Sequence, residues 1–362
     1  MALRVNCAAR FIARWKPRIV FSQTEKLRGA PVICNTNMSS ANAPKVFVSR
    51  RIPEKAKSLI ASQCNAILWE KDEPPTRAEY LEKISGIDGL FCLLTDKIDA
   101  QLLDAAGPNL RVVSTMSVGY DHVDVKECAR RNISVGYTPG ILTKATAELT
   151  IALLLATSRR LKEGIRAVET GEWGTWKPMW LCGQGLDGAT VGVVGMGRIG
   201  YTVAQCLNPF GVARFLYAGH RNADAEAELK AEFVDIDKLY SESDFVVACC
   251  ALTPETAGMF NADAFRKMKK TAVFVNSSRG GVVNQEDLIA ALESGEIGAA
   301  GLDVTTPEPL PTDSPLLSLK NCVVLPHIGS ATHDTREAMA VLAAENLIAG
   351  LKGEKMPSKI DD

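Results

Sequence analysis

Three polar side chains in the last third of the chain, Arg279, Glu308 and His327, each follow an apolar run of strand length. An arginine holds a carboxylate through two parallel N–H bonds, and a histidine donates a proton to a carbonyl oxygen near neutral pH. A carboxylate beside that histidine favours the protonated ring and fixes which nitrogen carries the proton. Together with a hydride donor, these groups can reduce a 2-keto acid.

A hydride donor is indicated by the segment from Gly195 to Gly200, in which Gly195, Gly197 and Gly200 have the spacing G-x-G-x-x-G. The first glycine permits a tight turn, the second lets a pyrophosphate approach the backbone, and the third lets helix and strand pack closely. Alone, this spacing describes any glycine-rich turn. The apolar strand before it and the apolar-periodic helix after it favour dinucleotide binding, with Arg198 and Ile199 at the helix start beside the phosphates.

The stretch after the next predicted strand indicates which dinucleotide binds. NAD sites usually place an acidic residue there, which accepts hydrogen bonds from the ribose hydroxyls. This chain has His220 and Arg221 instead, and no acid before Asp224. An arginine can pair with a 2′-phosphate, so we expect NADPH to be preferred and NADH to be possible. If Arg221 is only a solvated loop residue, the sequence leaves this choice open.

These residues are carried by strands that alternate with helices in two successive runs. Such a pattern calls for parallel sheets covered by helices on both faces. The expected fold class is therefore α/β, with two doubly wound parallel-sheet domains of the Rossmann or flavodoxin-like type and the active site in the cleft between them. Strands are predicted at 45–49, 89–94, 111–115, 190–195, 214–218, 245–252, 272–277, 298–304 and 322–325.

Two domains are expected. The second run forms a dinucleotide-binding domain over 143–326, and it begins with one long helix over 143–169 and a loop rich in glycine and tryptophan. The last helix has no strand after it, so we expect it to cross back to the first run. The substrate-binding domain then comprises 45–142 and 327–362.

Residues 1–44 differ from the rest of the chain in charge, with seven basic residues against one acidic residue. Arg10, Arg14 and Arg18 recur at four-residue steps beside an apolar stripe, which is typical of a mitochondrial presequence. The alternative is a leader without any targeting role, and Pro17 weakens the helix that a presequence needs. A start at Met38 would give a shorter, cytoplasmic form.

The overall composition excludes several classes of protein. A net charge of −1 and a pI near 6.5 predict no general binding to nucleic acid. No apolar run reaches the roughly 18 residues that span a bilayer, so no membrane partner is expected. The ten cysteines include no C-x-x-C pair, so we expect no metal site.

Taken together, the motifs of this chain resemble those of the D-isomer-specific 2-hydroxyacid dehydrogenases, over about residues 45–357. The segments that carry the resemblance are Met116 to His122, Tyr137 to Pro139, Trp176 to Gly183, the Gly195 to Gly200 turn, Ser278 to Gly280, Gly301 to Val304, Pro307 to Pro309 and Pro326 to Ser330.

The resemblance implies roles for individual residues. Arg279 holds the substrate carboxylate and carbonyl, His327 acts as acid and base with Glu308 as its partner, and the backbone of Val118 and Gly119 donates to the carboxylate. Ser330 and Trp176 are expected at the substrate, whereas Ser277 and Gly329 are expected at the cofactor with Asp303 near its carboxamide. The resemblance also places four further residues within reach of the cofactor: His220, Arg221, Arg279 and His327.

The resemblance also implies a reaction and an assembly. The reaction is NADPH-dependent reduction of the small 2-keto acids glyoxylate and hydroxypyruvate to glycolate and D-glycerate, by hydride transfer. The assembly is a homodimer, in which the tryptophan-rich loop at 171–188 is an arm that reaches the neighbouring subunit. Alternatively, Trp173, Trp176 and Trp180 pack beneath their own loop.

Other functions remain open at this stage. Another D-2-hydroxyacid dehydrogenase, such as a phosphoglycerate dehydrogenase, is disfavoured because no regulatory domain follows Pro357. The C-terminal binding protein corepressors resemble the same fold and use the cofactor to gate partner binding. The Trp176 to Gly183 segment, the absence of a long polar tail and the presequence-like leader favour the enzyme.

Of the four histidines, only His327 ends a strand beside matched partners, so we interpret it as catalytic rather than as a buried structural residue. His122 precedes a predicted helix, and we interpret it as a helix-entry residue rather than as an acid or base.

Overall fold

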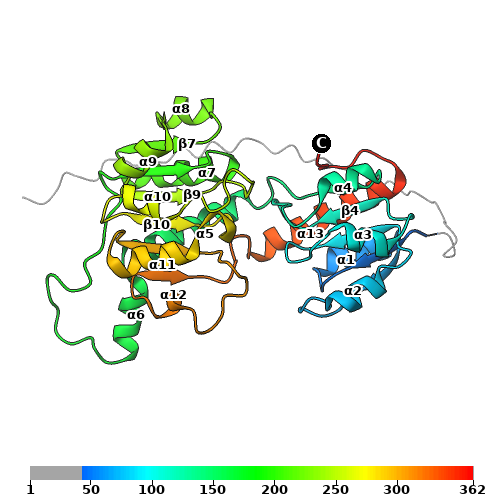
Figure 1. Cartoon of the computed structure of the whole chain (residues 1–362), viewed down its shortest axis with the longest axis horizontal. Coiled ribbons are helices and arrows are strands. Elements are labelled where there is room, and N and C mark those ends of the chain that lie inside the picture. The colour runs from blue at the N-terminus through cyan, green and yellow to red at the C-terminus, as the bar shows by residue number, and fades with distance from the viewer. Residues whose placement is uncertain (1–42, 362) are drawn as a thin grey trace, which may run out of the picture. The chain divides into compact units, whose positions relative to one another are not determined.

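Two parallel β-sheets organise the chain in the computed structural model, which describes residues 43–361 (Figure 1). The prediction of two doubly wound parallel sheets is confirmed. The predicted targeting segment lies almost wholly outside the described residues and stays a prediction. Among the helices of residues 43–361, none combines the length and the apolar composition that a membrane span requires.

The first sheet has five strands in the order β2-β1-β3-β4-β5, the flavodoxin-like order. Its strands are fully parallel, and the side chains of the central strands β1, β3 and β4 are buried from both faces, which explains their continuous apolar runs in the sequence. The strands are β1 (Lys45–Val48), β2 (Asn65–Leu68), β3 (Gly89–Cys92), β4 (Val112–Thr115) and β5 (Ser134–Gly136). One face is covered by α1 (Glu54–Ala61) and α13 (His333–Lys352), and the other by α2 (Arg77–Lys83), α3 (Ala100–Ala106) and α4 (Val125–Arg130).

The second sheet has seven strands in the order β12-β11-β10-β9-β6-β7-β8, which is the Rossmann order with one further strand. The helices α9, α10 and α11 cover one face and α5 and α7 the other (Figure 1). The strands are β6 (Thr190–Val194), β7 (Arg214–Ala218), β8 (Glu232–Phe233), β9 (Phe245–Ala248), β10 (Val273–Asn276), β11 (Ala299–Leu302) and β12 (Cys322–Val324). The helices are α5 (Thr143–Ser158), α6 (Leu161–Glu169), α7 (Arg198–Leu207), α8 (Ala223–Leu229), α9 (Ile236–Glu242), α10 (Ala262–Lys267), α11 (Gln285–Ser294) and α12 (Pro315–Ser318), with two 3₁₀ turns at Asn208–Phe210 and Gly280–Val282.

The C-terminal segment completes the first sheet. The buried side chains of α13 pack against α1, β3 and β4. Beyond α13, the backbone of Ser358 and Ile360 bonds to Tyr137 and Val135, and Lys359 pairs with Gly136 in an antiparallel bridge. The edge of the sheet at β5 is therefore covered by the residues that follow α13.

The prediction of one helix over 143–169 is wrong, because the chain turns between α5 and α6. Arg160 adopts a left-handed conformation with φ of +56°, which no residue within a right-handed helix can have. Its side chain pairs with Glu163 at 2.7 Å, and its Nη1 donates to the carbonyl oxygen of Cys182. The helical region therefore consists of two helices, α5 and α6, which are separated at Arg160.

A buried ion pair fixes the loop after β3 to the end of β1. The Arg50 guanidinium donates to Asp96 at 3.0 Å, and the two side chains are 6% and 1% exposed. Asp96 also accepts from the hydroxyl of Ser49 and from the backbone of Leu93. The carboxylate is thus fully bonded, as a buried charge requires.

We predict that Asp96→Ala lowers the free energy of unfolding by roughly 3–5 kcal/mol, because it leaves the buried Arg50 cation without its partner. Asp72→Ala is the matched control, since it removes the partner of Arg51 from a pair whose side chains are 57% and 74% exposed, and such pairs contribute little. Urea denaturation of both variants measures the difference. Equal stability of the two variants would contradict a supporting role for the buried pair.

Candidate active site

The three residues of the predicted acid, base and clamp follow neighbouring strands of the second sheet. Arg279 lies beyond β10, Glu308 beyond β11 and His327 beyond β12. These strands are adjacent and parallel, so their carboxyl ends meet at one edge. That edge is where doubly wound sheets bind their ligands.

His327 and Glu308 form a direct pair, with 2.8 Å between Nδ1 of the ring and Oε2 of the carboxylate. The other carboxylate oxygen accepts from the backbone N–H of Thr305 at 3.0 Å. Burial alone would raise the pKa of Glu308, but the bonds from His327 and Thr305 and the nearby Arg279 hold that pKa below its ordinary value. Glu308 is therefore ionised at neutral pH, and the second ring nitrogen of His327 is left for a substrate.

The backbone at His327 is held in place by Asp303. His327 has φ of +54°, a left-handed conformation that non-glycine residues adopt only under constraint. Its N–H donates to the Asp303 carbonyl, and the two carboxylate oxygens of Asp303 accept from the N–H groups of Ile328 and Gly329, each at 2.8 Å. Asp303 is 1% exposed, and burial raises its pKa. This residue, expected near the cofactor, thus also shapes the turn that carries the acid.

Arg279 extends to the loop that follows β4 of the first sheet. Its Nε donates to Asp121 Oδ1 at 2.9 Å and its Nη1 donates to the carbonyl oxygen of Ser278 at 2.9 Å. A Cβ on Gly119 would lie 1.8 Å from Nη2 of Arg279, so any larger residue there would displace the guanidinium. The structure therefore brings the predicted clamp and the predicted backbone donors Val118 and Gly119 to one place.

A cavity of about 630 Å³ opens beside the catalytic pair, within the range of small-molecule sites. His327, Glu308 and Asp303 line it, and so do Arg50 and Arg336. Sequence reasoning missed Arg336, which lies in the first turn of α13, and Asp121. A signal for Asp121 existed, since it is an acid within the Met116 to His122 segment, but nothing in the sequence pairs it with Arg279.

The turn from Gly195 to Gly200 fits a dinucleotide on three counts. Gly195 has φ of +96°, and a Cβ there would lie 2.7 Å from the backbone nitrogen of Cys250, at the point where the strand order reverses between β6 and β9. A Cβ on Gly197 would meet open space, whereas one on Gly200 would lie 2.2 Å from the Gly195 carbonyl. No side chain caps the start of α7. Its free N–H groups, including those near Arg198 and Ile199, therefore face the space that a pyrophosphate would occupy.

The end of β7 carries the residues expected at the 2′ position. Arg221 lies over the ring of Phe233 at 4.8 Å and pairs with Glu226 at 3.2 Å, and its side chain is 69% exposed. The neighbouring Asn222 donates to the Met196 carbonyl of the glycine turn. The stretch from His220 to Asn222 is thus tied to the predicted cofactor turn.

Three other expected site residues lie in different settings. Ser277 follows β10 and bonds to Thr150 of α5 at 2.6 Å. Ser330 is half-buried in the turn between His327 and α13. Trp176 is 81% exposed on the loop after α6 and does not line the cavity beside His327. Within the described part of the chain, Trp176 is therefore not brought to the site.

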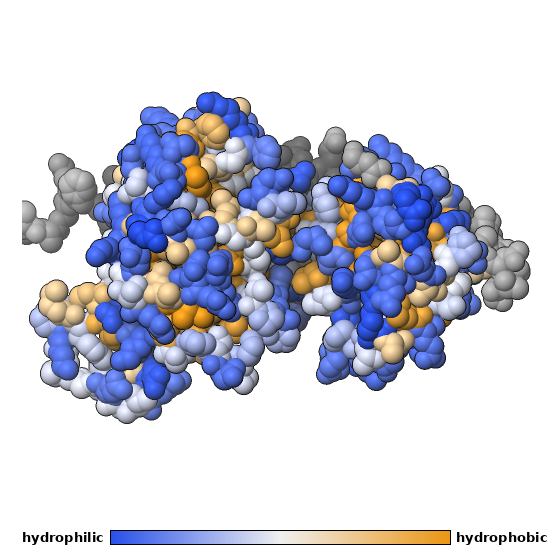
Figure 2. All heavy atoms as spheres, in the orientation of Figure 1, coloured by the Kyte–Doolittle hydropathy of each residue, from blue (hydrophilic) through white to orange (hydrophobic). Residues whose placement is uncertain are grey.

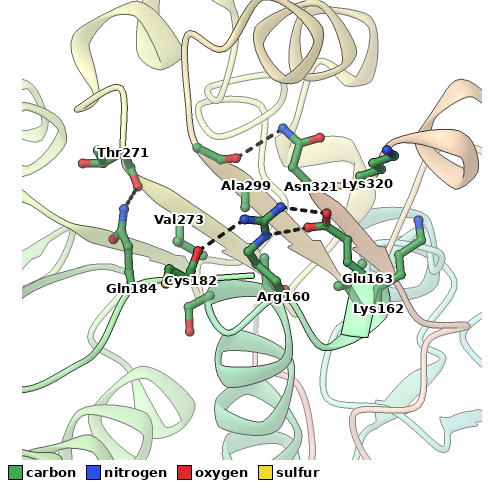
Figure 3. Close-up of a pocket in the computed structure, with 15 residues that line it drawn as sticks. Arg160, Lys162, Glu163, Cys182, Gln184, Thr271, Val273, Ala299, Lys320 and Asn321 are labelled. Carbon is green, nitrogen blue, oxygen red and sulfur yellow. Dashed lines mark hydrogen bonds and ion pairs between the residues drawn. The ribbon is translucent and has the colours of Figure 1, made fainter. Parts of the chain in front are cut away.

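A second cavity, of about 340 Å³, lies at the opposite edge of the second sheet (Figure 3). It is lined by residues at the starts of β10 and β11, including Val273 and Ala299, and by Arg160 and Gln184. Lys162, which also borders it, donates to three backbone carbonyls around α12 and so has no free bond for a ligand. Residues 43–361 contain no cluster of ligand-type side chains that could hold a metal ion.

Comparison with known proteins places these features in a family. A family model described as D-isomer specific 2-hydroxyacid dehydrogenase, NAD binding domain, matches residues 151–329. The human protein named glyoxylate reductase/hydroxypyruvate reductase is 57% identical over 319 residues, which cover 87% of this chain and 97% of the human one.

Solved structures give the same result. The TT0316 protein of Thermus thermophilus has a TM-score of 0.81 and 41% identity, covering 88% of this chain and 100% of that one. An NADPH-dependent glyoxylate/hydroxypyruvate reductase of Sinorhizobium meliloti, solved with NADP and malonate, has a TM-score of 0.76 and 30% identity, covering 88% and 96%. With this likeness over nearly the full length of its relatives, the chain belongs to the D-isomer specific 2-hydroxyacid dehydrogenases, which use a nicotinamide cofactor.

Proposed function

We propose that this chain reduces glyoxylate and hydroxypyruvate to glycolate and D-glycerate, with NADPH as the preferred cofactor. The observation that carries the proposal is the ionised Glu308 at 2.8 Å from Nδ1 of His327, at the strand edge shared with Arg279. The identity of the substrates is supported by the human relative, which is named for both acids.

The chain's own residues divide the work. Arg279 binds the substrate carboxylate, and the backbone N–H groups near Val118 and Gly119 add donors to it. Glu308 accepts from Nδ1 of the doubly protonated His327 ring, and Nε2 of that ring donates its proton to the carbonyl oxygen, which leaves a neutral ring with its proton on Nδ1. A bound nicotinamide cofactor supplies the hydride. The Gly195 to Gly200 turn would hold the cofactor's phosphates, and Asp303 would contact its carboxamide.

We predict that Glu308→Gln lowers kcat for glyoxylate reduction. The wild-type carboxylate accepts from Nδ1 of His327 at 2.8 Å and so fixes the ring that donates the proton, whereas a neutral amide binds that nitrogen less strongly. His327→Ala removes the proton donor, and kcat falls by about 10²–10⁴-fold while cofactor affinity stays near normal. An unchanged kcat in Glu308→Gln would show that Glu308 does not act through His327.

The preference for NADPH rests on Arg221, whose exposed guanidinium follows β7 where an NAD site usually has an acid. We predict that Arg221→Asp lowers the ratio of kcat/KM with NADPH to that with NADH, because it removes a cation and adds repulsion toward a 2′-phosphate. Arg266→Asp makes the same charge change on exposed α10 and should leave the ratio unchanged. An unaltered ratio in Arg221→Asp would refute the assignment.

We infer that the chain forms a homodimer through α6 and the loop after it. Leu161, Ile165 and Val168 lie at helical spacing and are 49%, 59% and 59% exposed, so the apolar face of α6 has no cover within the described chain. Figure 2 shows pale apolar colour at the surface on the segment beside α6. Trp173, Trp176 and Met179 add exposed apolar area on the adjoining loop.

We predict that the double variant Ile165→Glu, Val168→Glu elutes as a monomer, whereas the wild type has twice the chain mass of 39.0 kDa. Two charges would have to be buried at such an interface without partners. Light scattering after size exclusion measures the mass. Phe210→Glu is the control, as it charges another exposed apolar residue and should leave the mass unaltered. A monomeric wild type would exclude the dimer.

A further inference from the structure

The clamp residue Arg279 is held from the first sheet by a carboxylate that no role yet accounts for. Arg279 has five N–H groups, of which Nε donates to Asp121 and Nη1 donates to the Ser278 carbonyl. No described residue accepts from Nη2, which lies against Gly119. Asp121 therefore occupies one side of the guanidinium and leaves the Nη2 side for another carboxylate.

The loop that carries Asp121 is fixed by a chain of side-chain hydrogen bonds. Ser117 Oγ donates to the Gly119 carbonyl at 2.7 Å, so in its bond with Thr115 Oγ1 at 2.8 Å Ser117 must accept. The hydroxyl of Thr115 therefore donates to Ser117. Its oxygen must then accept from Nε2 of His122, at 2.9 Å. His122 is therefore the tautomer with its proton on Nε2, and its Nδ1 is a buried lone pair without a partner among the described residues.

The same arrangement determines the charge of the loop. Burial lowers the pKa of His122 to about 4, against a smaller opposing effect of Asp121. His122 is thus neutral at neutral pH, where its Nε2 donates to Thr115 and the ring adds no second positive charge beside Arg279. The loop presents the Asp121 carboxylate to the clamp, and the hydroxyl of Ser117 bonds to the backbone of the same loop.

We propose that Asp121 is a positioning residue, which orients the Arg279 guanidinium so that its free N–H groups meet the carboxylate of the keto acid. The proposal rests on the proposed function for the identity of that acid. The pair is partly exposed, at 22% and 32% of the two side chains, so water can still solvate the Arg279 cation when Asp121 is removed. Its effect should therefore appear in substrate binding and turnover rather than in unfolding.

Steady-state kinetics with glyoxylate test this directly. Asp121→Ala should raise KM for glyoxylate about tenfold or more and lower kcat, because the guanidinium is no longer aligned. The KM for NADPH should stay the same. Asp121→Asn should recover much of the loss, since its amide oxygen can still accept from Nε. Asp124→Asn is the matched control, as Asp124 lies on the same segment and only caps α4.

A double-mutant cycle with Arg279→Lys separates positioning from general damage. If Asp121 acts through the guanidinium, Asp121→Ala should cost far less in the Arg279→Lys background than in the wild type. Equal losses in both backgrounds, or wild-type kinetics in Asp121→Ala, would overturn the proposal.

Oxalate binding keeps this test separate from the proposed function. If the wild type reduces neither glyoxylate nor hydroxypyruvate, the proposed function fails, but calorimetric titration of the enzyme–NADPH complex with oxalate still measures the clamp. Asp121→Ala should weaken oxalate binding about tenfold relative to wild type and to Asp124→Asn. Unchanged oxalate affinity would overturn the positioning role whatever the substrate.

Discussion

The active site depends on one backbone turn, in which His327 leaves β12 in a left-handed conformation. A non-glycine residue in that region costs about 1–3 kcal/mol and persists only where the surroundings impose it. Asp303 imposes it through its carbonyl and both carboxylate oxygens. The turn aims the imidazole at Glu308, and it also sends the chain out of the second sheet toward α13. Acid placement and the connection between the sheets thus share one constraint.

The site also depends on the edge of the second sheet at which neighbouring parallel strands end. Arg279, Glu308 and His327 are close because β10, β11 and β12 are neighbours in the sheet. The clamp also needs the first sheet, since Gly119 leaves room for the guanidinium and Asp121 binds it. Neither sheet carries a complete site by itself. The opposite edge, where the second cavity lies, has no acid and base pair of this kind among its lining residues.

The sequence predicts features that depend on local pattern. Apolar runs and the turn residues that end them predict the glycine turn, the polar residues at the strand ends and the two parallel sheets. Each of these patterns extends over only a few residues. The short strands β2, β5 and β8 were not predicted. β8, for example, has only two residues, and both are exposed, so it contains no apolar run. The break at Arg160 was missed because arginine gives no signal for a left-handed turn.

Contacts between distant segments could not be predicted from pattern. Asp121 and Arg279 are 158 positions apart, and only the packing of the two sheets brings them together. Arg336 lies in an ordinary helical turn, and its place at the cavity follows from the direction in which α13 leaves His327. The tautomer of His122 likewise follows only from three hydrogen bonds that link its ring, two hydroxyl groups and a backbone carbonyl. Side-chain networks of this kind depend on how distant segments pack together, so they cannot be predicted from local patterns in a single sequence.

The covering of the first sheet by the C-terminal segment also has a consequence for biosynthesis. Domains generally fold as units while the chain emerges from the ribosome. Here one face of the first sheet awaits α13, and the edge at β5 awaits Ser358 and Ile360. The nascent chain therefore carries an uncovered apolar face and an open strand edge until these residues have been made, whereas the second sheet has all its own strands and helices before α13 is synthesised. Of the two sheets, the one that is synthesised first is thus the last to be completed.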